Sequence, residues 1–93
     1  MVEYMQPNFH VESFVLHMSD KEDFLLEFGK HLQKIRKEKG LSIREMDYRG
    51  EVEKDLISKI ENGKTNPTIF TLKKILTVLE LDFEEFFKGF NKI

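Results

Sequence analysis

The sequence of 93 residues contains no cysteine, no tryptophan and only two prolines. Without cysteine, neither a disulfide framework nor a thiolate metal site can form, and we expect an intracellular, cytoplasmic protein. No apolar run is long enough to span a bilayer, and no basic segment followed by an apolar stretch marks a secretory signal. The composition favours one small domain with no membrane association, whose core includes many of the nine phenylalanines.

Residue sets for catalysis and for cofactor or metal binding are also missing. The three histidines have no metal-ligand spacing, and His31 lies one helical turn after Glu27, with which we expect it to pair. The sequence contains no nucleophile–base set, glycine-rich phosphate loop or pair of catalytic carboxylates. We therefore predict that the protein is not an enzyme and that it uses no cofactor or metal.

Charge is distributed unevenly along the chain, although the net charge is only −2. Residues 1–29 carry a net charge of −5 and residues 75–93 one of −2. Residues 30–74 contain twelve basic and seven acidic side chains, a net charge of +5. A basic centre between acidic ends is expected of a localised phosphate-binding face, with chance clustering on solvated helices as the alternative.

The segment 9–18 can be interpreted in two ways. Four of its apolar residues share one helical face: Val11, Phe14, Val15 and Met18. Alternation of the same segment places apolar residues on both faces, which favours a strand rich in β-branched and aromatic residues. The first helix is then expected to begin at Ser19, with Glu22 completing a capping box. We divide the chain into an N-terminal extension and candidate dimerisation arm, 1–18, and a main domain, 19–90.

Four more helices are expected after this one, each with a marked start or end. Gly40 suits the left-handed end of the first helix. The predicted caps and box partners are Ser42 with Glu45, Thr68, and Asp82 with Glu85. The stripe of Phe83, Phe86, Phe87 and Phe90 is expected to be core rather than a ligand cage, with Phe90 as a candidate dimer contact.

Two short helices follow each other closely between residues 41 and 63, in the stretch LSIREMDYRGEVEKDLISKIENG. The second is expected from Lys54 to Glu61, closed by Gly63, with Leu56, Ile57 and Ile60 as its apolar residues. A connection of about one turn prevents the helices from lying antiparallel, so they must cross steeply. Such a crossed pair is a helix-turn-helix unit, which can present one helix to a DNA groove.

Three motifs carry a family resemblance: IRKEKGLS at 35–42, LISKIENGKTNP at 56–67 and TLKKILTVLELDFEEFF at 71–87. Together they resemble the lambda-repressor-like DNA-binding domain, the Cro/C1 or XRE-type helix-turn-helix, over roughly residues 28–87. The resemblance implies an all-α, compact five-helix domain. It also implies a sequence-specific transcriptional regulator that binds double-stranded DNA as a homodimer on a palindromic operator.

The resemblance also implies two sets of DNA-binding residues. The base-reading positions of the family fall on the recognition helix, at Lys54, Asp55, Ser58 and Lys59. Its phosphate-binding positions fall on the start of the supporting helix and on the loop after the recognition helix, at Ile43, Arg44, Asn62, Lys64 and Thr65. Each has a purely structural alternative: solvation for the lysines, a favourable charge at the helix start for Asp55, and stabilisation of the helix end for Asn62.

The sequence departs from the family pattern at four positions around the turn. Ile43 stands in place of a glutamine, Asp47 of an alanine, Glu51 of a glycine, and Glu53 of a serine or threonine cap. These replacements predict a poorly capped recognition helix, an uncomfortable left-handed residue at 51 and an altered turn geometry. They also support an alternative function, a protein-interaction module of antitoxin-like or regulatory type that binds a protein partner and has weak or no DNA binding.

Overall fold

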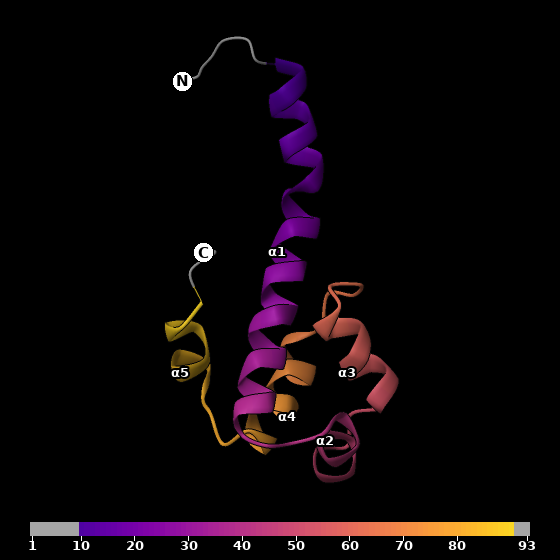
Figure 1. Ribbon diagram of the computed structural model, residues 1–93, viewed down its shortest axis with the longest axis vertical. Helices are drawn as coiled ribbons and strands as arrows, with labels where there is room; N and C mark the ends of the chain where they lie inside the picture. The colour runs from indigo at the N-terminus through magenta and orange to yellow at the C-terminus, as the bar shows by residue number, and fades with distance from the viewer. Residues whose placement is uncertain (1–9, 91–93) are drawn as a thin grey trace.

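The computed structural model describes the backbone of residues 10–90 and the side chains of residues 20–90. This part of the chain forms five α-helices and no strand, as Figure 1 shows. They are α1 (His10–Glu38), α2 (Ile43–Gly50), α3 (Lys54–Glu61), α4 (Ile69–Val78) and α5 (Phe83–Lys88). The predicted all-α, five-helix fold is confirmed. None of the described helices is apolar over a long enough stretch to cross a membrane.

Helix α1 is longer than the sequence predicted. Its backbone is helical from His10 onward, so the strand prediction for 9–18 is wrong over the described residues, and Ser19 lies inside a helix instead of capping one. Extending an existing helix adds one backbone hydrogen bond per residue, whereas a lone strand has no partner in the described part of this domain. The N-terminal part of α1 extends away from the other helices, and its C-terminal part packs against them (Figure 1).

The helix caps predicted for α2, α4 and α5 are confirmed. Ser42, Thr68 and Asp82 each accept a hydrogen bond from a backbone amide in the first turn of their helix. At α2 and α5 the backbone amide of the cap residue donates a hydrogen bond to a glutamate carboxylate, which completes both predicted capping boxes. At the end of α1, Gly40 takes a left-handed conformation with φ of 72°, and the next amide, of Leu41, bonds to the Arg36 carbonyl at 3.1 Å.

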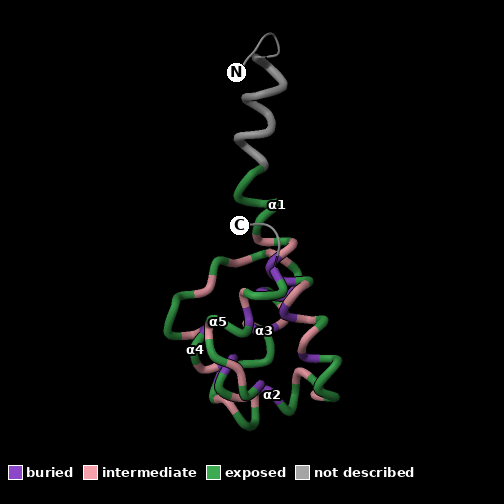
Figure 2. The backbone as a smooth tube through the Cα atoms, turned by 90° about the vertical axis from the view of Figure 1, so that its left-hand side faces the viewer, coloured by how far each residue is buried: buried purple, intermediate pink, exposed green. Residues whose placement is uncertain are grey.

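The core lies between the C-terminal part of α1 and the four shorter helices. Helix α1 packs against α3, α2 packs against both α3 and α4, and α4 packs against α5. Figure 2 shows the buried residues on the inward faces of these helices. The buried apolar residues of the core, on these helices and directly beside them, are Phe28, Leu32, Met46, Val52, Ile57, Ile60, Leu72, Ile75, Leu76, Leu79, Phe86 and Phe90.

The C-terminal phenylalanines belong to this core, as predicted, but Phe90 is not available for a dimer contact. Its side chain is only 7% exposed, because it packs at the edge of the Phe24 and Phe28 rings, with centroids 5.5 and 6.1 Å away. These aromatic contacts hold the chain after α5 against α1. The prediction of Phe90 as a surface for dimerisation is therefore wrong.

His31 connects α1 to α5 instead of pairing with Glu27. Its Nε2 donates a hydrogen bond to the Phe86 carbonyl at 2.7 Å, and its ring lies 4.6 Å from the Phe86 ring. Glu27 instead lies 3.9 Å from the ammonium of Lys30. The carbonyl of an adjacent helix, which the sequence does not reveal, thus replaces the predicted partner.

Candidate nucleic-acid interface

Helix α3 presents one face to the core and the opposite face to solvent. Ile57 and Ile60 are almost fully buried, whereas Lys54, Asp55 and Lys59 are exposed. Ser58 is half-buried between them. The predicted base-reading residues are therefore found on or beside the outer surface of α3.

The start of α3 has no cap of its own. Glu53, in the cap position, makes no side-chain hydrogen bond to the helix, as the sequence predicted. Instead the backbone amide of Lys54 donates to Oδ2 of Asp47, on α2, at 3.0 Å. Glu51, between the two helices, takes the left-handed conformation with φ of 58°, so the turn keeps the left-handed residue that a glycine would supply. A left-handed residue at 51, which the sequence predicted to be unfavourable for glutamate, is therefore present.

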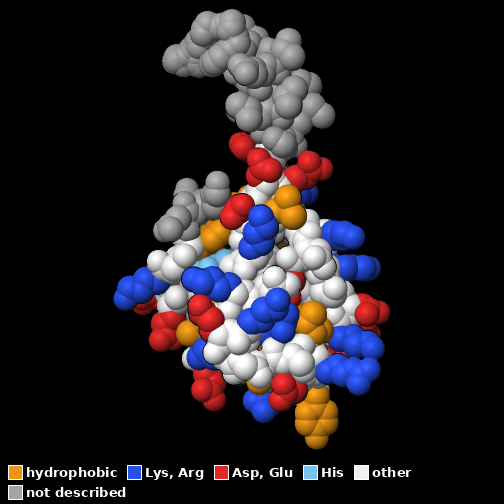
Figure 3. Space-filling model, viewed as in Figure 1, with side chains coloured by type: hydrophobic (Ala, Val, Ile, Leu, Met, Phe, Trp, Pro, Cys, Tyr) orange, Lys and Arg blue, Asp and Glu red, His pale blue; other side chains and the backbone are white. Residues whose placement is uncertain are grey.

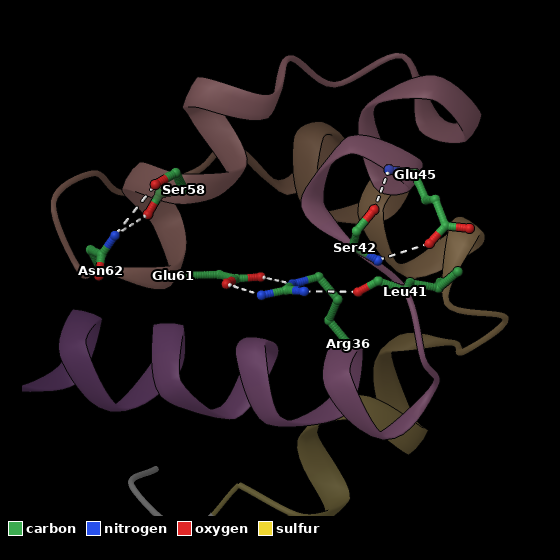
Figure 4. Close-up of polar contacts among 7 residues, drawn as sticks. All are labelled: Arg36, Leu41, Ser42, Glu45, Ser58, Glu61 and Asn62. Atoms are coloured by element: carbon green, nitrogen blue, oxygen red, sulfur yellow. Dashed lines mark hydrogen bonds and ion pairs between the residues drawn. The ribbon is translucent and has the colours of Figure 1, made fainter.

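The end of α3 is closed by Asn62 and Gly63. The Nδ2 of Asn62 donates to the Ser58 carbonyl at 2.9 Å, which supports the structural alternative for Asn62 (Figure 4). Gly63 has φ of 72°, and the Lys64 amide reaches back to the Lys59 carbonyl at 2.8 Å. A Cβ on Gly63 would lie 2.9 Å from the Leu26 Cα, so glycine is required here for both conformation and space.

The predicted phosphate-binding residues lie near the ends of α2 and α3. Arg44 is exposed in the first turn of α2, Lys64 is exposed in the loop after α3, and Thr65 beside it is half-buried. Ile43 is partly buried against the core, so its side chain is a packing residue rather than a phosphate contact.

The start of α2, which carries Arg44, is rigidly defined by its capping box. The Ser42 amide donates to Oε1 of Glu45 at 3.0 Å, and the Glu45 amide donates to Oγ of Ser42 at 3.1 Å (Figure 4). The bond from the Ser42 amide holds the pKa of Glu45 below its ordinary value.

Four cations on this surface have no carboxylate partner among the residues whose side chains the structure describes. Within residues 20–90, no carboxylate forms an ion pair with Arg44, Lys54, Lys59 or Lys64. In Figure 3 lysine and arginine side chains gather along the right-hand edge of the molecule, the side on which α3 lies in Figure 1. Acidic residues are also exposed at the start of α3, at Glu51, Glu53 and Asp55, so the surface is mixed and not uniformly positive.

A buried ion pair holds α3 against α1, and sequence reasoning missed it. The Nε of Arg36 lies 2.6 Å from Oε2 of Glu61 and its Nη2 lies 3.0 Å from Oε1 (Figure 4). A third bond runs from Nη1 of Arg36 to the Leu41 carbonyl at 2.8 Å. Glu61 follows Ile57 by four residues and Ile60 by one. That spacing on the apolar face is the signal that could have identified it.

Helices α1 and α3 also approach each other closely at Gly29. A Cβ at this position would collide with the backbone carbonyls of Ile60 and Glu61, at the end of α3. The absence of a side chain at 29 therefore allows Glu61 to come within reach of Arg36. This role of Gly29 depends on the packing of α1 against α3.

The described residues contain no cluster of three or more potential metal ligands among histidine, aspartate and glutamate. The surface around α3 instead combines exposed cations, short polar side chains and helix ends. These groups are suited to binding phosphates and the edges of bases.

Comparison with known proteins agrees with this geometry. A family model described as helix-turn-helix matches residues 32–86. Among curated relatives, the HTH-type transcriptional regulator SlrR of Bacillus subtilis is 40% identical over 60 residues, covering 63% of this chain and 40% of SlrR. The HTH-type transcriptional regulator PuuR of Escherichia coli is 42% identical over 59 residues, covering 63% of this chain and 32% of PuuR.

A third relative is closer to this chain in length. The control protein C.MunI of a Mycoplasma species is 35% identical over 71 residues, which cover 75% of this chain and 96% of C.MunI. By contrast, this chain spans less than half the length of SlrR and of PuuR. The fold and the crossed pair of α2 and α3 define a helix-turn-helix protein. The chain belongs to the helix-turn-helix family of the Cro/C1 or XRE type.

Proposed function

We propose that this protein is a cytoplasmic, sequence-specific transcriptional regulator that binds double-stranded DNA as a homodimer. The observation that carries the proposal is the exposed face of α3, which has an exposed lysine near each end and is fixed to the core by the buried Arg36–Glu61 pair. A rigidly held helix with free polar groups on its outer face is suited to the major groove. The regulators SlrR and PuuR and the control protein C.MunI support this function by similarity.

In this proposal one group of residues contacts bases and a second group contacts phosphates. Lys54 and Lys59 extend from the exposed face of α3 and can donate to guanine O6 and N7, while Asp55 can accept from a cytosine amino group. Ser58 is small enough to allow close approach of the helix to the base edges. Arg44, Lys64 and Thr65 hold the helix in register by contacts with phosphates, while Asn62, whose amide bonds to Ser58, keeps the end of α3 in place beside them.

A homodimer follows from the size of this surface. One α3 covers only a few base pairs, whereas two copies about 34 Å apart reach successive turns of the major groove and require a palindromic site. Two surfaces are candidates for the contact between copies. One is the arm 10–18, which extends from the domain (Figure 1), and the other is the exposed apolar pair Ile69 and Phe70 at the start of α4.

The test is selection of bound sequences from a pool of random duplexes, followed by binding isotherms at several salt concentrations. We expect a selected palindrome that binds far more tightly than a scrambled duplex, with affinity falling steeply as salt increases because phosphate contacts release counterions. A pool with no enriched sequence, together with binding that does not depend on salt, would contradict the proposal.

The second candidate is a protein-interaction module with weak or no DNA binding. The exposed carboxylates of Glu51, Glu53 and Asp55 favour it, since they would lie near DNA phosphates. Failure of the selection experiment would replace the regulator with this module. The exposed lysine and arginine side chains on the same surface favour DNA binding, so DNA-binding regulation stays the primary proposed function.

A further inference from the structure

Asp47 receives hydrogen bonds from both sides of the turn that separates α2 from α3. Its backbone carbonyl accepts from the amide of Glu51 at 3.1 Å, which closes the end of α2. Its carboxylate accepts from the amide of Lys54 at 3.0 Å, which is the first residue of α3. Asp47 thus accepts the hydrogen bonds that end α2 and begin α3, on either side of the turn.

The residue in the cap position before α3 does not cap the helix. Glu53 occupies the cap position with φ of −57° and ψ of 140°, and its side chain makes no bond to the helix. The first four amides of a helix need partners outside the helix, and a carboxylate is the best acceptor near the positive end of the helix dipole. Asp47 supplies that acceptor from the neighbouring helix instead of from the preceding residue.

A cap on another helix has a consequence that a cap at position 53 lacks. A serine at 53 would bond to amides of its own helix, in the second or third position, and would stabilise α3 without linking it to α2. The Asp47 bond joins two helices, so it also fixes the position of the start of α3 relative to α2. Lys54, the exposed residue whose amide is held, lies directly at this link.

The geometry points to Asp47 as a positioning residue for DNA recognition: its carboxylate locks the start of the recognition helix onto the supporting helix. Arg36 and Glu61 hold the other end of α3, so the recognition helix is fixed at both ends from neighbouring helices. Because it concerns the DNA-reading helix, this role rests on the proposed function. The bond itself is a property of the free protein.

Two measurements on the intact chain test this role. The first is hydrogen exchange of the Lys54 amide in the absence of DNA, where Asp47→Ala is expected to lower protection by roughly tenfold, the equivalent of losing one helix cap. The second is the ratio of affinities for the selected duplex and for a scrambled duplex. This ratio is expected to fall in Asp47→Ala, while Asp47→Asn, whose amide oxygen can still accept, keeps most of both quantities.

The double variant Asp47→Ala/Glu53→Ser separates positioning from simple capping. The serine is expected to restore thermal stability but neither the protection of Lys54 nor the affinity ratio. Recovery of the affinity ratio in this variant would mean that Asp47 only stabilises the helix, and would overturn the proposal. Deleting a negative charge near DNA is expected to raise affinity for both duplexes alike. This general effect cancels in the ratio of the two affinities.

Glu53→Ala is the matched control, since it deletes a nearby carboxylate that makes no bond to the helix. It is expected to leave both Lys54 protection and the affinity ratio unchanged. Unchanged Lys54 protection in Asp47→Ala would overturn the proposal whatever the DNA result. If no duplex is selected but Lys54 loses protection, the link at Asp47 stands and the DNA-binding function fails, so the two failures are distinct.

Discussion

Two glutamates occupy backbone conformations that usually favour glycine. Glu51 has φ of 58° in the turn before α3, and Glu80 has φ of 60° after α4. At Glu80 the helix ends as the α1 and α3 helices do, with the following amide, of Leu81, bonded to the Leu76 carbonyl at 3.0 Å. The hydrogen bonds of each turn hold these residues in a conformation that a Cβ makes unfavourable.

Glu51→Gly should therefore stabilise the protein. The gain is expected to be about 0.5–1 kcal/mol, because relief of left-handed strain is partly offset by the greater flexibility of glycine when unfolded. Denaturant melts of the two proteins measure it. Glu53→Gly is the control, since φ of −57° carries no such strain, and it should give no gain. An equal gain in both variants would contradict the strain at 51.

The lysines around α3 should differ in how they affect DNA binding. Lys54→Ala or Lys59→Ala should cost roughly 1–3 kcal/mol on the selected duplex and relax preference at one position of the site. Lys64→Ala should weaken binding to all duplexes alike and reduce the slope of log affinity against log salt by about one unit. Binding isotherms on matched and scrambled duplexes at several salt concentrations show the difference.

Lys88→Ala provides the control for this series. Lys88 is exposed on α5, which lies on the opposite side of α1 from α3 in Figure 1. Its loss should leave the affinity for both duplexes and the salt slope unchanged. If Lys54, Lys59 and Lys64 variants all behave like Lys88→Ala, the surface around α3 is not the DNA-binding face.

At the scale of helices, the Arg36–Glu61 pair connects α1 to α3. Both side chains are buried, and the Leu41 carbonyl binds one of the remaining donors of the guanidinium. Arg36→Met would leave the Glu61 carboxylate buried without a partner, so a loss of about 3–5 kcal/mol is expected in denaturant melts. Lys37→Met, at an exposed neighbour, should change stability by about 0.5 kcal/mol at most.

The double variant Arg36→Met/Glu61→Leu tests whether the loss comes from the unpaired charge. Removing both charged groups should recover much of the stability lost in Arg36→Met, because no isolated carboxylate remains in the core. A double variant that is as unstable as the sum of both single variants would instead indicate that packing geometry, and not charge, dominates at this site.

The capping box of α2 should make stability depend on pH. The Ser42 amide lowers the pKa of Glu45 in the folded protein, so the ionised carboxylate is favoured by folding. Its contribution is fully present above the ordinary pKa of 4.5 and is lost as the pH falls through the lower, folded value. Glu45→Gln keeps an acceptor for the amide but cannot titrate. In thermal melts this variant should lose less stability than the parent between pH 4.5 and about pH 3. Equal losses of stability in the two proteins would contradict a lowered pKa of Glu45 in the folded state.

At the scale of the whole molecule, the proposed homodimer requires a contact surface between two copies. Ile69 and Phe70 are 74% and 64% exposed at the start of α4, four and five residues after Thr65 in the loop that follows α3. Ile69 lines a hollow of about 200 Å³, together with apolar residues that include Phe24, Pro67 and Phe87. An interface here would lie beside the loop after α3 that is proposed to contact phosphates.

Ile69→Lys should therefore weaken the homodimer. A buried lysine at the centre of an interface is expected to raise the dimer dissociation constant by roughly tenfold or more. Light scattering across a range of protein concentrations measures it. Tyr48→Lys is the control, since Tyr48 is 90% exposed on α2 and does not line the hollow at Ile69. A parent protein that stays monomeric, with and without DNA, would contradict the homodimer, and an unaffected Ile69→Lys dimer would indicate the arm 10–18 instead.

The sequence by itself determined the local structure of this protein. Caps at Ser42, Thr68 and Asp82 and the apolar spacing of α3 located four helices, and Gly40 located the end of the first, because these signals act within a few residues. The family motifs likewise indicated the helix-turn-helix. They also identified the surface of α3 as the candidate site, and the exposure of its lysines agrees with that prediction.

Only the tertiary structure decided which polar groups meet across helices. The pairing of Arg36 with Glu61, the bond from Asp47 to the Lys54 amide and the burial of Phe90 against α1 each join segments whose proximity depends on packing. The same holds for His31, whose partner is a carbonyl on α5. The sequence shows which side chains can donate or accept hydrogen bonds. Packing of the helices around the core determines which of these groups come within bonding distance.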